Sequence, residues 1–114
     1  MPVEIPEIIS VTSQHDGPTV AILAGIHGDE YEGVIAALSL ARELPGELLS
    51  GTVKIVSPAH PAAWHSCSRI SPIDDANLAR VFPGYQNGSA TEQVAHVITE
   101  QVIKHADVLI DLHS

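Results

Sequence analysis

The chain has 114 residues, of which 45% are hydrophobic and 17% are charged, a composition typical of one globular domain. Its formal charge of −9 argues against nucleic acid and membranes as partners, because nucleic acids and anionic membranes both attract basic surfaces. The single cysteine, Cys67, excludes an intrachain disulfide, and the first residues lack the pattern of a secretory signal. No apolar run approaches the roughly 18 residues that span a bilayer. We therefore expect a cytoplasmic protein.

The first half of the chain alternates between strand and helix signals. Three segments read as strands because β-branched and apolar residues dominate them: 7–12, 19–24 and 52–56. The second is apolar enough to be buried on both faces. A segment with helical periodicity lies between the second and third predicted strands, and Pro45-Gly46 ends it. One face of that helix carries four apolar residues: Val34, Ile35, Leu38 and Ala41. This order of elements predicts an α/β fold.

The second half contains a long segment, residues 58–88, that is rich in proline and has no regular period. Such a connection inside a compact domain is usually either functional or a regular element that was not recognised, and we favour the functional interpretation. Ser89 and Glu92 form a capping-box pattern, which predicts a helix from about Thr91 to His105. Residues 107–112 then read as a final strand with a continuous apolar run. If the chain stopped after this strand, the strand would be poorly covered, so we expect the N-terminal part of a larger domain.

The segment Gly25–Gly33 lies where the second predicted strand turns into a helix, and it contains His27 and Glu30, three residues apart. With His113 after the last strand, they would complete the two-histidine, one-glutamate set of catalytic zinc sites. Such a site keeps an open position for water. The spacing alone leaves other interpretations open. His27 could cap the helix, Glu30 could favour the positive helix N-terminus, and His113 could be an ordinary strand-end histidine.

Three segments in this order resemble the succinylglutamate desuccinylase/aspartoacylase family of zinc carboxypeptidase-like hydrolases: Gly25–Gly33, Asp75–Gly84 and Asp111–Ser114. The resemblance runs from about Pro18 to the last residue. It implies an α/β three-layer sandwich with a mostly parallel or mixed central sheet, truncated after the strand ending at His113. Residues 1–114 would then be the incomplete N-terminal part of a zinc-dependent hydrolase catalytic domain.

The family resemblance also implies a chemistry. One Zn²⁺ per chain would be held by His27, Glu30 and His113, and zinc-activated water would hydrolyse the amide bond of a small N-acylated amino acid or similar amide. Arg69 and Arg80 would bind substrate carboxylates, for which planar guanidinium groups are suited. The alternative for both arginines is a solvated loop charge or a structural pair with one of two acidic residues: Asp74 or Asp75.

The family's general-base glutamate is expected beyond Ser114, so no catalytic residue is assigned, and we expect the isolated chain to be inactive. Ala79 departs from the family's Asn-Leu-Asn-Arg pattern and cannot supply amide hydrogen bonds, which puts the family's usual substrate in question. Asn77 is expected to have a structural role in the loop. Asp29 and Asp111 could each orient a ligand histidine or act only as local charges.

Two other functions remain open. The first is a carboxypeptidase-type metallopeptidase, which the sequence does not separate from a deacylase. The second is a metal-binding but catalytically inert fragment or assembly subunit. For any of these functions, the expected partners besides the substrate are further copies of the chain in a homo-oligomer or a missing C-terminal portion.

Overall fold

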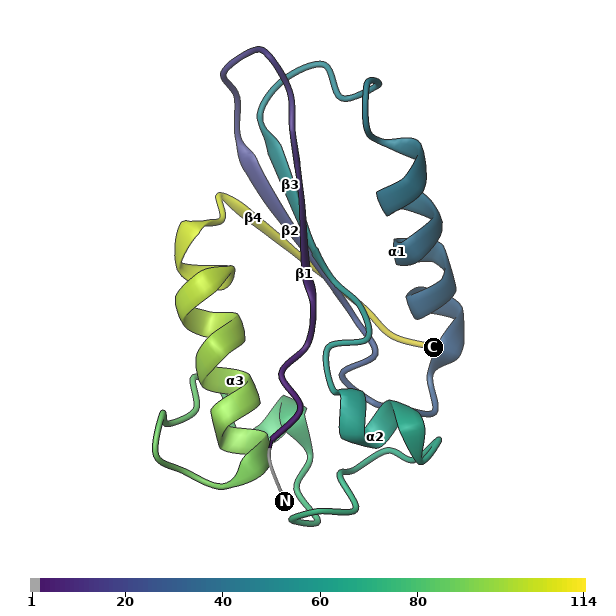
Figure 1. Cartoon of the computed structure of the whole chain (residues 1–114), viewed down its shortest axis with the longest axis vertical. Coiled ribbons are helices and arrows are strands. Elements are labelled where there is room, and N and C mark those ends of the chain that lie inside the picture. The colour runs from purple at the N-terminus through teal and green to yellow at the C-terminus, as the bar shows by residue number, and fades with distance from the viewer. Residues whose placement is uncertain (1–2) are drawn as a thin grey trace.

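The computed structural model describes residues 3–114, and its centre is one mixed sheet with helices on both faces (Figure 1). The four strands are β1 (Ile8–Thr12), β2 (Thr19–Ala24), β3 (Thr52–Val56) and β4 (Val108–Leu112). They lie in the order β1-β3-β2-β4, with β1 antiparallel to β3, and β2 parallel to both β3 and β4. The predicted α/β class and mixed sheet are therefore confirmed. The last strand ends at Leu112, one residue before His113.

Helices cover the sheet on its two faces, so the predicted three layers are present (Figure 1). The α-helices are α1 (Tyr31–Glu43), α2 (Pro61–His65) and α3 (Ala90–Gln101), and the 3₁₀ turns are η1 (Leu78–Arg80) and η2 (Ile103–His105). Side chains of β2 alternate between two core clusters: Ala21 and Leu23 pack in the cluster of α3, whereas Ile22 and Ala24 pack in that of α1. Burial of β2 on both faces is thus confirmed.

Three local features differ from the sequence-based predictions. Residues 61–65 form the short helix α2 inside the segment predicted to be irregular, with Pro61 in its first turn, where a missing N–H costs no hydrogen bond. The α3 helix ends at Gln101, and the remaining turn to His105 is 3₁₀. Ile35 is 57% exposed. The helix α1 turns Val34 and Ala37 toward the sheet, so the side chain of Ile35 lies at the side of the helix, facing solvent.

The predicted capping box at the start of α3 is present. The Ser89 hydroxyl accepts from the Glu92 backbone N–H, and the Glu92 carboxylate accepts from the backbone N–H of Ser89. Two of the four N–H groups that a helix start leaves unpaired thereby gain partners.

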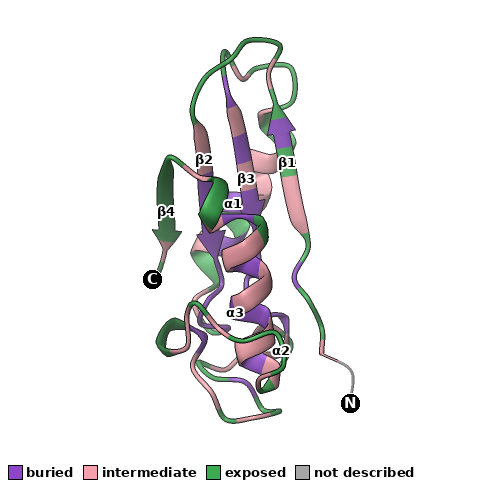
Figure 2. Ribbon diagram, turned by 90° about the vertical axis from the view of Figure 1, so that its left-hand side faces the viewer, coloured by how far each residue is buried: buried purple, intermediate pink, exposed green. Residues whose placement is uncertain are grey.

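Strand β4 lies at the edge of the sheet and is largely exposed (Figure 2). Its apolar residues Val108, Leu109 and Ile110 are 41–48% exposed. The strand is therefore poorly covered within residues 3–114, in agreement with the expectation from the sequence. The parallel pairing of β4 with β2 places Leu112 beside Ala24. Residues that follow these two strands therefore meet at one edge of the sheet. Within residues 3–114, no helix has both the length and the apolar character that crossing a membrane requires.

Candidate metal centre

The turn between β2 and α1 depends on two glycines. Gly25 has a φ of +78°, and a Cβ atom there would lie 2.8 Å from the Val34 side chain. A Cβ atom at Gly28 would lie 2.1 Å from the Ala63 carbonyl, so only glycine lets the turn pack this closely against α2. This packing fixes the direction in which His27 and Glu30 leave the edge of the sheet.

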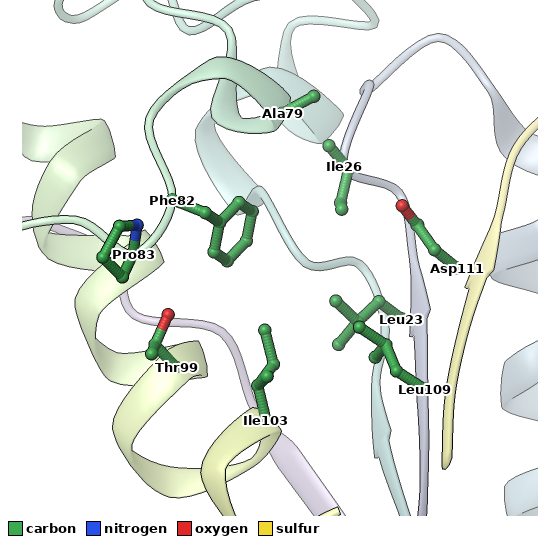
Figure 3. Close-up of a pocket in the computed structure, with 9 residues that line it drawn as sticks. All are labelled: Leu23, Ile26, Ala79, Phe82, Pro83, Thr99, Ile103, Leu109 and Asp111. Atoms are coloured by element: carbon green, nitrogen blue, oxygen red, sulfur yellow. The ribbon is translucent and has the colours of Figure 1, made fainter.

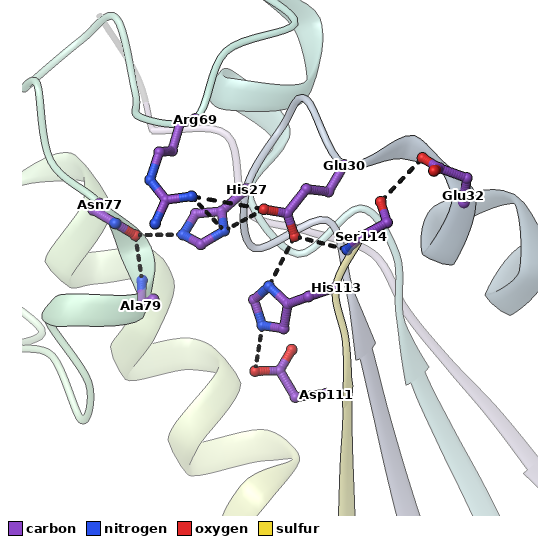
Figure 4. Close-up of polar contacts among 9 residues, drawn as sticks. All are labelled: His27, Glu30, Glu32, Arg69, Asn77, Ala79, Asp111, His113 and Ser114. Atoms are coloured by element: carbon purple, nitrogen blue, oxygen red, sulfur yellow. Dashed lines mark hydrogen bonds and ion pairs between the residues drawn. The ribbon is translucent and has the colours of Figure 1, made fainter.

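The structure brings His27, Glu30 and His113 together. One potential ligand atom from each lies within 4.8 Å of the other two. The Glu30 carboxylate lies between the two rings, with Oε2 2.8 Å from Nδ1 of His27 and Oε1 2.9 Å from Nδ1 of His113 (Figure 4). Glu30 and His113 are 83 positions apart in the chain and meet because β2 and β4 are neighbours in the sheet.

The outer nitrogen of each ring faces an oxygen acceptor (Figure 4). Nε2 of His27 lies 3.1 Å from Oδ1 of Asn77, and Nε2 of His113 lies 2.9 Å from Oδ2 of Asp111. The Asn77 atom also accepts from the backbone N–H of Ala79 at 3.0 Å, which identifies it as the amide oxygen. His27 must therefore donate its Nε2–H to Asn77. Nε2–H of His113 can likewise donate to Asp111, and in that tautomer Nδ1 carries a lone pair.

When neutral, both imidazoles then direct an Nδ1 lone pair at Glu30. A nitrogen lone pair and a carboxylate oxygen less than 3 Å apart repel each other unless a proton or a cation lies between the two atoms. Two imidazole nitrogens and a carboxylate are also a ligand set of catalytic zinc sites. By this chemistry, the three residues fit a divalent metal ion.

The charges in the cluster suit a cation. Burial would raise the pKa of Glu30, but the backbone N–H of Ser114, together with hydrogen bonds from the two histidine rings when these carry a proton on Nδ1, outweighs it and holds that pKa below its usual value. The hydrogen bond to Asp111 raises the pKa of His113, and Glu30 adds to this against the effect of burial. Glu30, whose side chain is only 14% exposed, is therefore ionised at neutral pH.

The two predicted substrate arginines have different positions. Nη1 of Arg69 lies 3.7 Å from Oε2 of Glu30 and 3.4 Å from Nδ1 of His27, so Arg69 reaches the cluster itself (Figure 4). Because arginine can only donate, this contact agrees with a lone pair on Nδ1 of His27. Arg80, in η1, is exposed, and its side chain forms no hydrogen bond or ion pair with any residue of 3–114. Neither arginine forms the alternative pair with Asp74 or Asp75 within that range.

Asn77 is the functional candidate whose role the sequence did not reveal, since we expected only a loop role for it. The structure adds to that role a hydrogen bond to a candidate ligand. Asp111 holds His113, as one of its two interpretations anticipated. Asp29 is exposed and contacts neither histidine among the described residues. His65 pairs with Glu4 at the surface.

A cavity of about 370 Å³ opens beside the cluster, between β4 and α3 (Figure 3). Ile26, next to His27, and Asp111, which holds His113, both line it. Its other lining residues are mainly apolar: Leu23, Ala79, Phe82, Pro83, Thr99, Ile103 and Leu109. The methyl group of Ala79 thus contributes to an apolar wall where the family's asparagine would bring an amide.

Known proteins resemble this chain in sequence and structure. Residues 16–114 match the model of the succinylglutamate desuccinylase/aspartoacylase catalytic domain. The chain is 41% identical to the N-alpha-acetyl-L-2,4-diaminobutyric acid deacetylase of Halomonas elongata over 106 residues, which cover 93% of this chain and 31% of that protein.

Two solved structures resemble it closely. A succinylglutamate desuccinylase from Silicibacter sp. TM1040 has a TM-score of 0.88 at 36% identity. The product-bound ectoine utilization protein EutE (DoeB) from Ruegeria pomeroyi has a TM-score of 0.87 at 36% identity. Each match covers 94% of this chain and 32% of the other. The chain thus spans about a third of the length of these relatives.

The family model covers most of the chain, and it includes all three segments on which the resemblance rests. The similar structures reproduce the same strand and helix arrangement over nearly the whole chain. This chain belongs to the succinylglutamate desuccinylase/aspartoacylase family.

Proposed function

We propose that this chain supplies the metal-binding part of a zinc-dependent deacylase, which hydrolyses the amide bond of an N-acylated amino acid or a similar small amide. The proposal rests on one observation above all. The Nδ1 atoms of His27 and His113 both face the partly buried carboxylate of Glu30, while their outer nitrogens lie beside oxygen acceptors. One Zn²⁺ per chain would satisfy all three groups.

Zinc in such a site lowers the pKa of water to about 7 and polarises a carbonyl group, which is the chemistry that amide hydrolysis needs. The residues of this chain prepare that site. Asn77 and Asp111 hold the ring protons outward, so that Nδ1 of His27 and of His113 stays free to bind metal. Glu30 supplies a negative charge that lowers the net charge of the centre.

Arg69 is the residue placed best to bind substrate. Its guanidinium lies at the cluster, and its side chain is 54% exposed, so it can donate to a substrate carboxylate or to negative charge on the amide oxygen. Arg80, exposed after the Asn77 turn, is proposed to bind a second substrate anion. The relative from Halomonas elongata bears the name of an N-acetylated amino acid deacetylase, which supports a small acylated amino acid as substrate.

The carboxylates nearest the cluster are already engaged. Glu32 accepts from the Ser114 hydroxyl at 3.0 Å, and Asp111 accepts from His113. We propose that the group that transfers the proton during hydrolysis is not among residues 3–114. The 114-residue chain should therefore bind zinc but release little or no product.

Metal content tests the zinc assignment. Elemental analysis of the purified chain should give one zinc per chain, and His113→Ala should lose most of it. His15→Ala is the matched control, because His15 is exposed and lies in the turn before β2, away from the cluster. Zinc retained in His113→Ala at the control level would overturn the ligand assignment.

Amine release tests the reaction. The complete product of the gene should release amine from N-acetyl-L-2,4-diaminobutyric acid faster than from short peptides. Faster cleavage of peptides would refute the deacylase proposal in favour of a carboxypeptidase-type enzyme, even if zinc binding were as expected.

A further inference from the structure

Behind the candidate ligand turn lies a buried histidine that the proposed chemistry does not use. His60 is 1% exposed and occupies the position before the first residue of α2. Its Nε2 atom lies 3.3 Å from Oγ1 of Thr91, in the first turn of α3. Its Nδ1 atom is buried and has no hydrogen-bond partner within residues 3–114. The contact with Thr91 is the side-chain hydrogen bond of the ring within residues 3–114, and the Ile26 backbone also acts on the ring.

Thr91 is fully buried and is bound by Asp74 through two contacts. The Thr91 backbone N–H donates to Oδ2 of Asp74 at 2.7 Å, and its hydroxyl donates to Oδ1 at 2.8 Å. Asp74 also accepts from the backbone N–H of Ala76 at 3.2 Å. Burial raises the pKa of Asp74, but these hydrogen bonds outweigh it and hold that pKa below its usual value.

These contacts fix where the protons lie. Ionised Asp74 can only accept, so the Thr91 hydroxyl gives it its one proton. Oγ1 of Thr91 can then only accept from His60, which places the ring proton of His60 on Nε2. Burial lowers the pKa of His60 by more than the charge of Asp74 and the Ile26 backbone raise it, so the ring is neutral. The direction of donation is thus from His60 to Thr91 to Asp74.

One end of this chain of hydrogen bonds reaches the turn that carries His27. The backbone N–H of His60 donates to the Gly25 carbonyl at 3.1 Å, and that of Ala59 donates to the Ala24 carbonyl at 2.7 Å. The segment before α2 therefore extends the pairing with β2 up to the residues next to His27.

The other end reaches the loop that carries Asn77. Asp74 binds the backbone of Ala76, whose carbonyl accepts in turn from the backbone N–H of Ser71 at 3.0 Å. Asn77, the acceptor for His27, follows directly. The donor and the acceptor of the His27–Asn77 hydrogen bond thus belong to two segments that are connected through the hydrogen bonds of His60, Thr91 and Asp74.

We propose that the buried hydrogen-bond chain of His60, Thr91 and Asp74 positions His27 for metal binding, by fixing the His27 turn against the Asn77 loop. The three are positioning residues, and this inference rests on the proposed metal site. Loss of the Thr91 hydroxyl would leave the Nε2–H of His60 without an acceptor inside the core, and the ring would have to move to recover one. His27 and Asn77 would then lose their alignment.

The test compares Thr91→Val, which has nearly the same shape but no hydroxyl, with Thr91→Ser, which keeps the hydroxyl. Zinc affinity by chelator competition should fall about tenfold or more in Thr91→Val, the size of effect that outer-shell contacts have, and should be retained in Thr91→Ser. The absorption spectrum of the Co²⁺-loaded protein should change only in Thr91→Val. Wild-type affinity and spectrum in Thr91→Val would overturn the proposal.

A measurement without metal separates this inference from the proposed function. In ¹⁵N-histidine NMR spectra of the metal-free chain, the ring shifts of His27 should be the same in wild type and Thr91→Ser and should differ in Thr91→Val. Should Thr91→Val fail to fold, Asp74→Asn, which keeps an oxygen for the helix, must shift the His27 signals. Unchanged His27 signals in the folded variant would overturn the positioning role, whereas a wild type that binds no zinc would overturn the proposed function alone.

Discussion

Replacing Asn77 by leucine should weaken zinc binding while leaving the fold intact. The amide oxygen of Asn77 accepts from Nε2 of His27 at 3.1 Å and from the Ala79 backbone at 3.0 Å. Leucine has a similar size but no acceptor. His27 would then lose the contact that keeps its proton outward, and its Nδ1 lone pair would no longer be held toward Glu30.

Two effects set the size of the change. Loss of an acceptor behind a metal-binding histidine typically reduces affinity 10–100-fold, or about 1.4–2.8 kcal/mol. Loss of the cap on the Ala79 N–H should lower the free energy of unfolding by about 1 kcal/mol. Because this second effect is small, Asn77→Leu should remain folded at room temperature.

The expected loss of zinc affinity in Asn77→Leu can be measured by competition with a chromophoric chelator. Asn77→Asp is the matched control, because its carboxylate still accepts from both groups and should retain or raise the affinity. Urea unfolding of the metal-free proteins separates the stability effect from the metal effect. If Asn77→Leu and Asn77→Asp bind zinc equally well, Asn77 does not hold the His27 proton in the way that metal binding requires.

Three further predictions concern the fold. Ser89→Ala removes one half of the capping box and should lower the free energy of unfolding by about 1 kcal/mol in urea titrations, with unchanged zinc content. A loss of zinc in this variant would show that the start of α3 and the metal site are coupled. Gly28→Ala should destabilise the protein far more than Gly46→Ala, since the new Cβ atom would lie 2.1 Å from the Ala63 carbonyl, whereas at Gly46 there is open space and only the φ of +83° disfavours a side chain. Equal melting temperatures would contradict the packing of the turn on α2. The pKa of Asp74 is held below its usual value of 3.8, so its contribution to stability is complete above that pH and is lost as pH falls through the lower folded pKa. In unfolding experiments between pH 5 and about pH 2, Asp74→Asn should therefore lose less stability on acidification than the wild type. An equal loss in both proteins would show that Asp74 does not cause it.

The strongest sequence signals were local and were confirmed. The apolar run of β2 predicted a strand buried on two faces, and Ser89 with Glu92 predicted the start of α3. The convergence of His27, Glu30 and His113 could be anticipated because a motif after one strand and a histidine after another meet when the strands are parallel neighbours. That a metal binds there stays a prediction.

The features that the sequence did not reveal depend on tertiary contacts. Asn77 lies 50 positions from His27 in a segment without a regular period, so no spacing rule connects them. The five residues of α2 are too few to show a helical period, although Pro61 is a typical first residue. Ile35 fits the apolar face of α1 by period alone, and only packing on the sheet shows that Val34 and Ala37 are the buried pair.

We propose above all that His27, Glu30 and His113 bind one zinc ion through the inward nitrogens of both rings. A crystal of the zinc-loaded chain, with anomalous data collected on both sides of the zinc absorption edge, tests this most directly. We predict one zinc peak among residues 3–114, in contact with the Glu30 carboxylate and with Nδ1 of His27 and His113. Ligation through Nε2, or a zinc peak at other side chains, would overturn the assignment of these ligands.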